Sequence, residues 1–202
     1  ACLGTQARFT ALSKQFTITE FYGTWTDVDL SLFAIEVTDP ADQALLKSVA
    51  SPFVFSNKLH RGQQLVTIGY GIGSNPTRAQ VIGKDSDCKV FSAEGEFRFM
   101  GDPDELNPGP YKAWSFANGC DVSHGDSGSA MMDAQTGEVI GIIWTGKIPK
   151  DPKVQTSAFL DALMANPTED VWKELSFGVP AAKIGEFLTD LTKSGTLDAS
   201  TN

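Results

Sequence analysis

The sequence predicts an all-β fold, a barrel or a sandwich, closed by a C-terminal helix. Many short apolar segments are separated by Gly, Pro, Asn and Asp, which is typical of β-strands joined by turns. Helical spacing of apolar residues occurs only late in the chain. A length of 202 residues is sufficient for one large domain, or for two small halves that share one core.

The first half of the chain contains most of the expected strands. Residues 28–37 are apolar on both faces, as in a buried strand, and this segment stops at Asp39-Pro40. The other expected strands are residues 16–19, 64–71, 79–82, 88–91 and 97–99. An acidic loop with prolines follows at residues 101–110, and we interpret it as a solvated surface excursion.

A hairpin and two helices complete the prediction. Residues 130–132 and 138–144 flank a turn and form the hairpin. A short helix is expected around residues 159–164, where apolar residues share one face. A second helix carries an apolar stripe that begins at Ile184, with Pro180 at its first turn and Gly195 just past its end.

Composition excludes some classes of partner. Hydrophobic residues make up 41% of the chain and charged residues 20%, an ordinary globular balance. A net charge of −9 gives no electrostatic support to a nucleic-acid or anionic-membrane partner. No apolar run reaches the length of a membrane span. The chain starts at Ala1, as expected either after removal of a secretory signal or in a processed fragment.

Three cysteines fit no zinc site, even with the two histidines. Cys88 and Cys120 are separated by a strand-rich stretch and can be bridged, which leaves Cys2 odd. An odd cysteine in an oxidised protein points to a partner on another chain or to a free thiol. The alternative is three buried reduced thiols.

The residues GDSG at positions 125–128 have the composition of a nucleophile loop. A serine hydroxyl needs a base within hydrogen-bond reach, and the oxyanion it generates needs convergent N–H donors. Gly125 lets the backbone turn its N–H outward, so the N–H groups of Gly125 and Ser127 can converge on a carbonyl oxygen. The alternative is a Gly-rich turn that the serine only caps.

The motif GDSGSAM, the hairpin after it and the segment VIGIIWTG resemble the trypsin/chymotrypsin-like serine proteases, and most of all their bacterial secreted branch. The ending FGVP before a C-terminal helix resembles that branch too. The resemblance implies a chymotrypsin-like pair of six-stranded β-barrels, the first incomplete in this chain. Residues 1–60 would be the remainder of the first barrel and residues 61–202 the second, together forming one protease domain.

In that family the order along the chain is His, then Asp, then Ser. Asp29, in the segment DLSLF, matches the family Asp at the head of a strand and is the candidate that orients the histidine; Asp27 is a weaker competitor. Asp29 precedes Ser127 by 98 residues, close to the roughly 93 of the family template. Ser127 is the candidate nucleophile.

The catalytic base is missing at the expected place. The family template puts His roughly 45 residues before the Asp, and no His precedes Asp29. His124 lies on the oxyanion turn itself, where the resemblance makes it a residue of the cleft wall. His60 lies well downstream of the family position and is expected to be an exposed loop residue.

Two interpretations follow. In the first, a separate N-terminal segment stays associated and contributes the His, bridged through Cys2. Asp126 also fits this, since the family Asp before the serine binds a newly cut N-terminal ammonium, and a buried carboxylate without a partner is costly. In the second, the protein is a catalytically inactive homologue that acts as a binding or scaffold module, with an unpaired edge on its first barrel.

The resemblance also implies a specificity pocket. Asp121, six residues before Ser127, would form its floor and select Lys or Arg through a charge-assisted contact. Trp144, Thr145 and Gly146 would form its walls, with Gly178 a further possibility, although the family has a small residue at the place of Trp144. The implied substrates are polypeptides. No metal or organic cofactor is implied, and the expected location is secreted or periplasmic.

Overall fold

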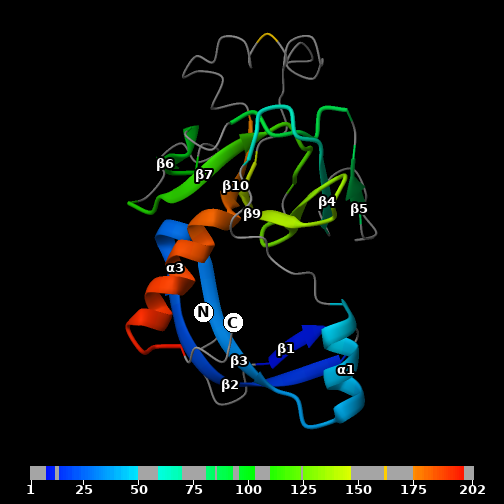
Figure 1. Ribbon diagram of the computed structural model, residues 1–202, viewed down its shortest axis with the longest axis vertical. Coiled ribbons are helices and arrows are strands. Elements are labelled where there is room, and N and C mark those ends of the chain that lie inside the picture. Colours follow the sequence, from blue (N-terminus) through cyan, green and yellow to red (C-terminus); the bar gives the residue numbers. More distant parts are fainter. Residues whose placement is uncertain are drawn as a thin grey trace.

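A computed structural model describes residues 8–11, 14–49, 59–69, 81–84, 86–92, 96–102, 110–123, 125–146, 162 and 175–197. Its strands form a three-stranded sheet, β1-β2-β3, and a seven-stranded sheet, β5-β4-β8-β9-β10-β7-β6 (Figure 1). The strands are β1 (Arg8–Ala11), β2 (Lys14–Trp25), β3 (Leu30–Glu36), β4 (Leu65–Gly69), β5 (Val81–Gly83), β6 (Arg98–Met100), β7 (Ala113–Asn118), β8 (Ala130–Asp133), β9 (Val139–Thr145) and β10 (Ser176–Pro180). The helices are η1 (Thr26–Val28), α1 (Pro40–Val49) and α3 (Ala181–Lys193).

The predicted fold class, mostly β with a C-terminal helix, is confirmed. The pair of six-stranded barrels, the first of them incomplete, is not confirmed, because the sheets have three and seven strands and neither closes within the described residues. The larger sheet nevertheless curls, because Lys89 pairs with Gln64 before β4 and Val90 pairs with Asn118 at the end of β7. These two bridges replace the strand expected at residues 88–91.

The core of the larger sheet lies inside this curl. Leu65, Phe116 and Met131 have no exposed surface and pack there with Ile140 and Ile143. The predicted disulfide between Cys88 and Cys120 is present beside them, and both cysteines are buried. It ties the segment after β7 to the bridging residues and so fixes the end of the sheet that carries the nucleophile loop.

The three-stranded sheet has little core of its own. Among its described side chains only Phe16 is buried, and none of β3 is, although β3 is apolar on both faces. Phe21 keeps 40% of its surface exposed. An apolar sheet with this much exposed surface is one that another layer would stabilise.

The β2–β3 hairpin joins the two sheets at its η1 end (Figure 1). Val28 of η1 is buried against Ala113 of β7, and Trp25 packs against Phe187 of α3 in a tilted arrangement with ring centroids 4.4 Å apart. Helix α3 therefore covers the junction between the sheets. The other end of the hairpin, with β1 and α1, extends away from the larger sheet.

The C-terminal helix agrees with its prediction. Ile184 is buried and Phe187 and Leu188 pack beside it, Pro180 is the residue before its first turn, and Gly195 has φ +74° just past its end. The earlier helix expected around residues 159–164 lies outside the described residues, except for Ala162.

Helix α1 was not predicted, because Asp39-Pro40 was interpreted only as the end of a strand. Asp39 is in fact the N-terminal cap: its carboxylate accepts the N–H of Ala41 at 2.8 Å, and its carbonyl accepts that of Gln43 at 3.0 Å. A capping Asp followed by Pro at the first helical position is a helix-start signal. The same two residues therefore stop one element and start the next.

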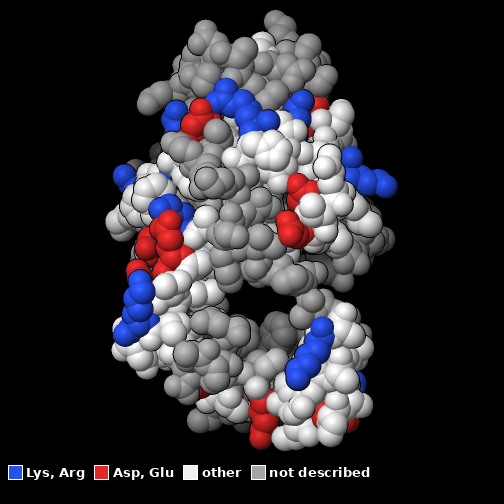
Figure 2. All heavy atoms as spheres, in the orientation of Figure 1, with Lys and Arg blue, Asp and Glu red and all other residues white. Residues whose placement is uncertain are grey.

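Charges of both signs are interspersed on the face that Figure 2 shows, so the described part of this face carries no continuous basic patch. This agrees with the net charge of −9. Within the described residues no helix has the length and apolar character needed to cross a membrane.

Candidate active site

The predicted nucleophile loop, residues 125–129 between β7 and β8, is anchored to β9 by two backbone hydrogen bonds. The N–H of Gly128 donates to the carbonyl of Ile143 at 2.7 Å, and the N–H of Ile143 donates to the carbonyl of Ser129 at 2.9 Å. The loop between β7 and β8 therefore continues the pairing of β8 with β9. Ser127 lies at the exposed turn of this loop, directly before the anchored residue.

Asp126 organises the inside of the loop. Its buried carboxylate accepts the backbone N–H of Ser123 at 2.9 Å and the hydroxyl of Ser123 at 3.3 Å. Its own N–H donates to the carbonyl of Ser123, and its carbonyl accepts the N–H of Ser129 at 2.9 Å. The carboxylate thus has hydrogen-bond donors within the loop, and the ammonium expected from the resemblance is not required to satisfy it.

The backbone N–H groups of Gly125 and Ser127 are the two that the sequence predicts to form an oxyanion hole. Within the described residues, the N–H groups of Gly125 and Ser127 donate no hydrogen bond. Gly125 has φ +104°, outside the range that residues with a side chain adopt without strain. The loop conformation therefore requires glycine at this position, and both N–H groups are without an acceptor among the described residues.

Asp29 lies at the C-terminal end of η1, at the junction of the two sheets. It has φ 42° and ψ 46°, the left-handed conformation, and its N–H donates to the carbonyl of Thr26 at 3.3 Å. Buried Val28 next to it anchors the turn in the junction. The competitor Asp27 lies in the first turn of η1, and both Asp27 and Asp29 are exposed.

The environment of Asp29 disfavours its charged form. Partial burial raises the pKa of its carboxyl, and the negative charge of Asp102 raises it further. Asp102 is held by the hydroxyl of Thr145, which donates to its carboxylate at 2.7 Å. No described residue donates a hydrogen bond to the Asp29 carboxylate. A donor or a cation placed beside Asp29 would therefore be stabilised there.

The end of β9 connects the loop that carries Ser127 with Asp102, the carboxylate whose charge acts on Asp29. Ile143 holds the nucleophile loop, and Thr145, two residues on along the same strand, holds Asp102, whose charge acts on Asp29. The part of Asp102 was not predicted, because no local signal in the acidic loop distinguished it from the other carboxylates there.

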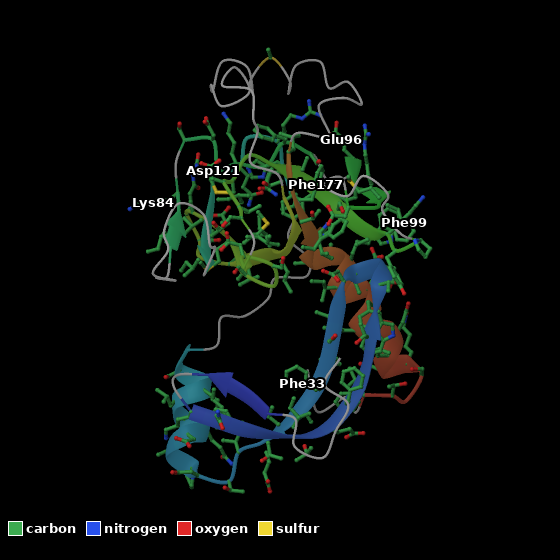
Figure 3. The ribbon with its side chains drawn as sticks, turned by 180° about the vertical axis from the view of Figure 1, so that it is seen from behind. Phe33, Lys84, Glu96, Phe99, Asp121 and Phe177 are labelled. Atoms are coloured by element: carbon green, nitrogen blue, oxygen red, sulfur yellow. A yellow bond between two sulfur atoms is a disulfide. The ribbon has the colours of Figure 1, made fainter. Side chains whose placement is uncertain are left out.

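The four residues of the expected specificity pocket have different surroundings. Asp121 is exposed and lies on the part of the molecule built on the larger sheet, as does Phe177 (Figure 3). The Trp144 indole donates to the hydroxyl of Ser115 at 2.9 Å and packs in the sheet junction. Thr145 is buried against Asp102, and Gly146 lies against the side chain of Val122.

Neither histidine is placed as a base by the described contacts. His60 is exposed and precedes β4, with its backbone N–H 3.4 Å from the side-chain oxygen of Gln63. His124 and Cys2 lie outside the described residues. In the part of the chain that the structure describes, no three His, Cys, Asp or Glu side chains gather as a metal site would require.

Comparison with known proteins finds no matching protein family and no matching curated protein. Among solved structures, the chain is similar to Rv3671c from M. tuberculosis H37Rv, described as the Ser343Ala mutant in its inactive form. The TM-score is 0.51 at 20% sequence identity, over 92% of this chain and 70% of that chain. This likeness shows a protease-like fold. It assigns no role to individual residues.

Proposed function

We propose that this protein is a serine endopeptidase in which Ser127 is the nucleophile, Asp29 orients the base, and the base is a histidine from polypeptide outside this sequence. The observation that carries the proposal is the exposed Ser127 in a loop whose Gly125 and Ser127 N–H groups are unbonded within the described residues. A protease-like fold supports the same class of reaction.

The surroundings of Asp29 support the idea of a missing base. Asp29 is exposed as a residue, yet desolvation and the negative charge of Asp102 raise the pKa of its carboxyl, and no described residue donates a hydrogen bond to it. An imidazole would donate one N–H to Asp29 and accept the Ser127 proton at its other nitrogen. The exposed apolar surface of the first sheet, where β3 has no buried residue, offers a place for such a segment to pack.

The reaction would proceed through an acyl-enzyme. The Ser127 oxygen bonds to the peptide carbonyl carbon as its proton passes to the imidazole, and the N–H groups of Gly125 and Ser127 stabilise the negative oxygen. The C–N bond then breaks as the imidazole gives that proton to the leaving amine. Water cleaves the acyl ester by the same route in reverse and regenerates the hydroxyl.

Two further parts of the proposal concern context. Polypeptides are the expected substrates, and a segment bridged through Cys2 is one way to keep the histidine in place. A secreted or periplasmic location fits the disulfide, since disulfides persist in oxidising compartments. A preference for Lys or Arg through Asp121 remains a prediction, and the exposure of that residue gives it little support.

One observation favours an alternative function. No histidine in the described residues contacts Ser127, as expected for a catalytically inactive homologue that only binds polypeptides. Such a homologue would keep the loop, because Asp126 and Ser123 stabilise it without any substrate.

Labelling with a fluorophosphonate separates the two functions. Ser127 should be phosphonylated with loss of HF, and the mass of the intact chain should rise by one phosphonyl group, the probe less HF. Ser127→Ala should abolish labelling, while Ser194→Ala, which removes an exposed hydroxyl at the end of α3, should not change it. Non-reduced mass would reveal a segment bridged through Cys2. A folded protein that carries a segment bridged through Cys2 and still takes up no probe would contradict the protease and favour the binding module.

A further inference from the structure

We propose that Ser123 is a positioning residue: acting through Asp126, it fixes the two N–H groups that would bind the oxyanion, so the loop is set before any chain is cut. The proposal rests on the proposed peptidase function and concerns how the same site is regulated. It departs from the expectation that a newly cut N-terminal ammonium holds Asp126. The evidence is the set of contacts between Ser123 and Asp126, together with the fixed place of the segment that leads to Ser123.

Asp126 joins two consecutive turns, and each turn contains one of the candidate oxyanion donors. In the first turn the N–H of Asp126 donates to the carbonyl of Ser123 at 3.0 Å, and Gly125 lies within it. In the second turn the N–H of Ser129 donates to the carbonyl of Asp126 at 2.9 Å, and Ser127 lies within it. A displacement of Asp126 therefore moves both donors.

Ser123 supplies two donors to one oxygen of the Asp126 carboxylate. Its backbone N–H lies 2.9 Å from Oδ2 and its hydroxyl 3.3 Å from the same atom. The other oxygen, Oδ1, lies against Gly69 of β4, where an added Cβ atom would overlap it. Asp126 is 8% exposed, so turning its carboxylate away from Ser123 would leave a buried charge with fewer hydrogen bonds.

The segment that leads to Ser123 is itself fixed. Val122, directly before it, is 3% exposed and belongs to the core of the larger sheet. Cys120 is bonded through sulfur to Cys88, and its carbonyl accepts the Ser176 hydroxyl at 2.8 Å. The hydrogen bonds of Ser123 therefore connect the nucleophile loop to a part of the fold that a covalent bond restrains.

This arrangement bears on how the site is switched on. A buried carboxylate needs hydrogen-bond donors, and Ser123 supplies them from three residues away in sequence. The loop then keeps its shape without a charged chain end beside Asp126. Activation of the site depends on the arrival of the histidine and not on the formation of a new N-terminus.

Fluorophosphonate labelling at varied probe concentration tests the role of the Ser123 hydroxyl. The Ser127 oxygen displaces fluoride from phosphorus, and the serine proton leaves with it as HF. Because oxyanion donors stabilise the transition state, Ser123→Ala should lower the maximal rate, kinact, and leave the half-saturating concentration, KI, unchanged. The fall should be about 10-fold, as expected for one hydrogen bond to a charged group.

Two variants of equal shape separate the hydroxyl from packing. Ser123→Thr keeps the hydroxyl and should label at nearly the natural rate, whereas Ser123→Val lacks it and should be as slow as Ser123→Ala. This pair also decides the question if Ser123→Ala does not fold. Thr136→Ala is the control, because the Thr136 hydroxyl likewise donates to a carboxylate, that of Glu138 at 3.1 Å, in the turn between β8 and β9. It should leave kinact unchanged.

Amide hydrogen exchange measures the loop without any need for the histidine. The amides of Asp126 and Ser129 close the two turns, so both should exchange about 10-fold faster in Ser123→Ala and at the natural rate in Ser123→Thr.

The outcomes separate this inference from the proposed function. Labelling of Ser123→Ala or Ser123→Val at the natural kinact, or equal slowing in Thr136→Ala, would overturn the role of Ser123 and leave the peptidase in place. Unchanged exchange at Asp126 and Ser129 in folded Ser123→Ala would do the same. Absence of labelling on protein that carries a bridged segment would overturn both.

Discussion

Gly69 lies beneath the nucleophile loop, and adding one methyl group there should disturb catalysis more than stability. A Cβ on this last residue of β4 would overlap the Asp126 carboxylate and lie 3.0 Å from Asp126 Cγ and 2.9 Å from Ser129 Oγ. Unbonded carbon atoms rest about 3.5–4.0 Å apart, so in Gly69→Ala the Asp126 Cγ must move by at least about 0.5–1 Å, and the overlapping carboxylate oxygen by more.

The expected magnitudes follow from this displacement. Overpacking costs about 1–3 kcal/mol, and the lower backbone entropy of unfolded Ala offsets about 0.4–1 kcal/mol of it. The net loss lowers the Tm of a domain of this size by roughly 2–4 °C per kcal/mol. Because Asp126 holds the turn between Gly125 and Ser127, a shift near 1 Å should reduce the reaction rate of Ser127 by up to about 100-fold.

The assay is the second-order rate of fluorophosphonate labelling, measured beside Tm on the same samples. Gly83→Ala serves as the control, since its Cβ would lie 2.6 Å from the Thr67 hydroxyl and would crowd β4 without touching Asp126. It should lose comparable stability and keep its labelling rate. If Gly69→Ala labels at the natural rate, or if Gly83→Ala slows equally, then contact with Asp126 does not position the loop.

Two other predictions concern stability. Reducing the bond between Cys88 and Cys120, which closes a loop with a sequence separation of 32, should cost about 4 kcal/mol and lower Tm by roughly 8–16 °C. An unchanged calorimetric Tm, on a chain that mass spectrometry shows to be reduced, would contradict this. Asp29→Asn should stabilise the fold at pH 7 by up to about 1 kcal/mol, limited by partial exposure to water. Burial and Asp102 raise the Asp29 pKa above its ordinary 3.8. The protonated carboxyl therefore contributes its full share to the free energy of unfolding below pH 3.8, and this contribution is lost as the pH rises through the folded-state pKa. Equal urea midpoints for the natural protein and Asp29→Asn at pH 7 would refute that reasoning. Below pH 3.8 the two proteins are expected to have equal midpoints.

Several features of the fold could be predicted from local pattern alone. The hairpin of β8 and β9, the helix α3 with Gly195 after it, and the turn at Gly125 each depend on residues close together in sequence. Period, turn residues and positive φ are properties of short segments, and a sequence displays them directly. The same applies to Asp39-Pro40, where the signal for α1 was present and was interpreted for only one of its two effects.

The arrangement of the candidate site was decided by tertiary structure. Nothing near Asp29 in sequence indicates that Asp102 will raise its pKa, and nothing near Gly146 indicates that Val122 will fill the space beside it. Both contacts arise because β9 lies between the nucleophile loop and the junction of the two sheets. Sequence alone therefore determined which groups are capable of the chemistry. Only packing decided their partners, because burial and close contact depend on residues that the chain brings together from far apart.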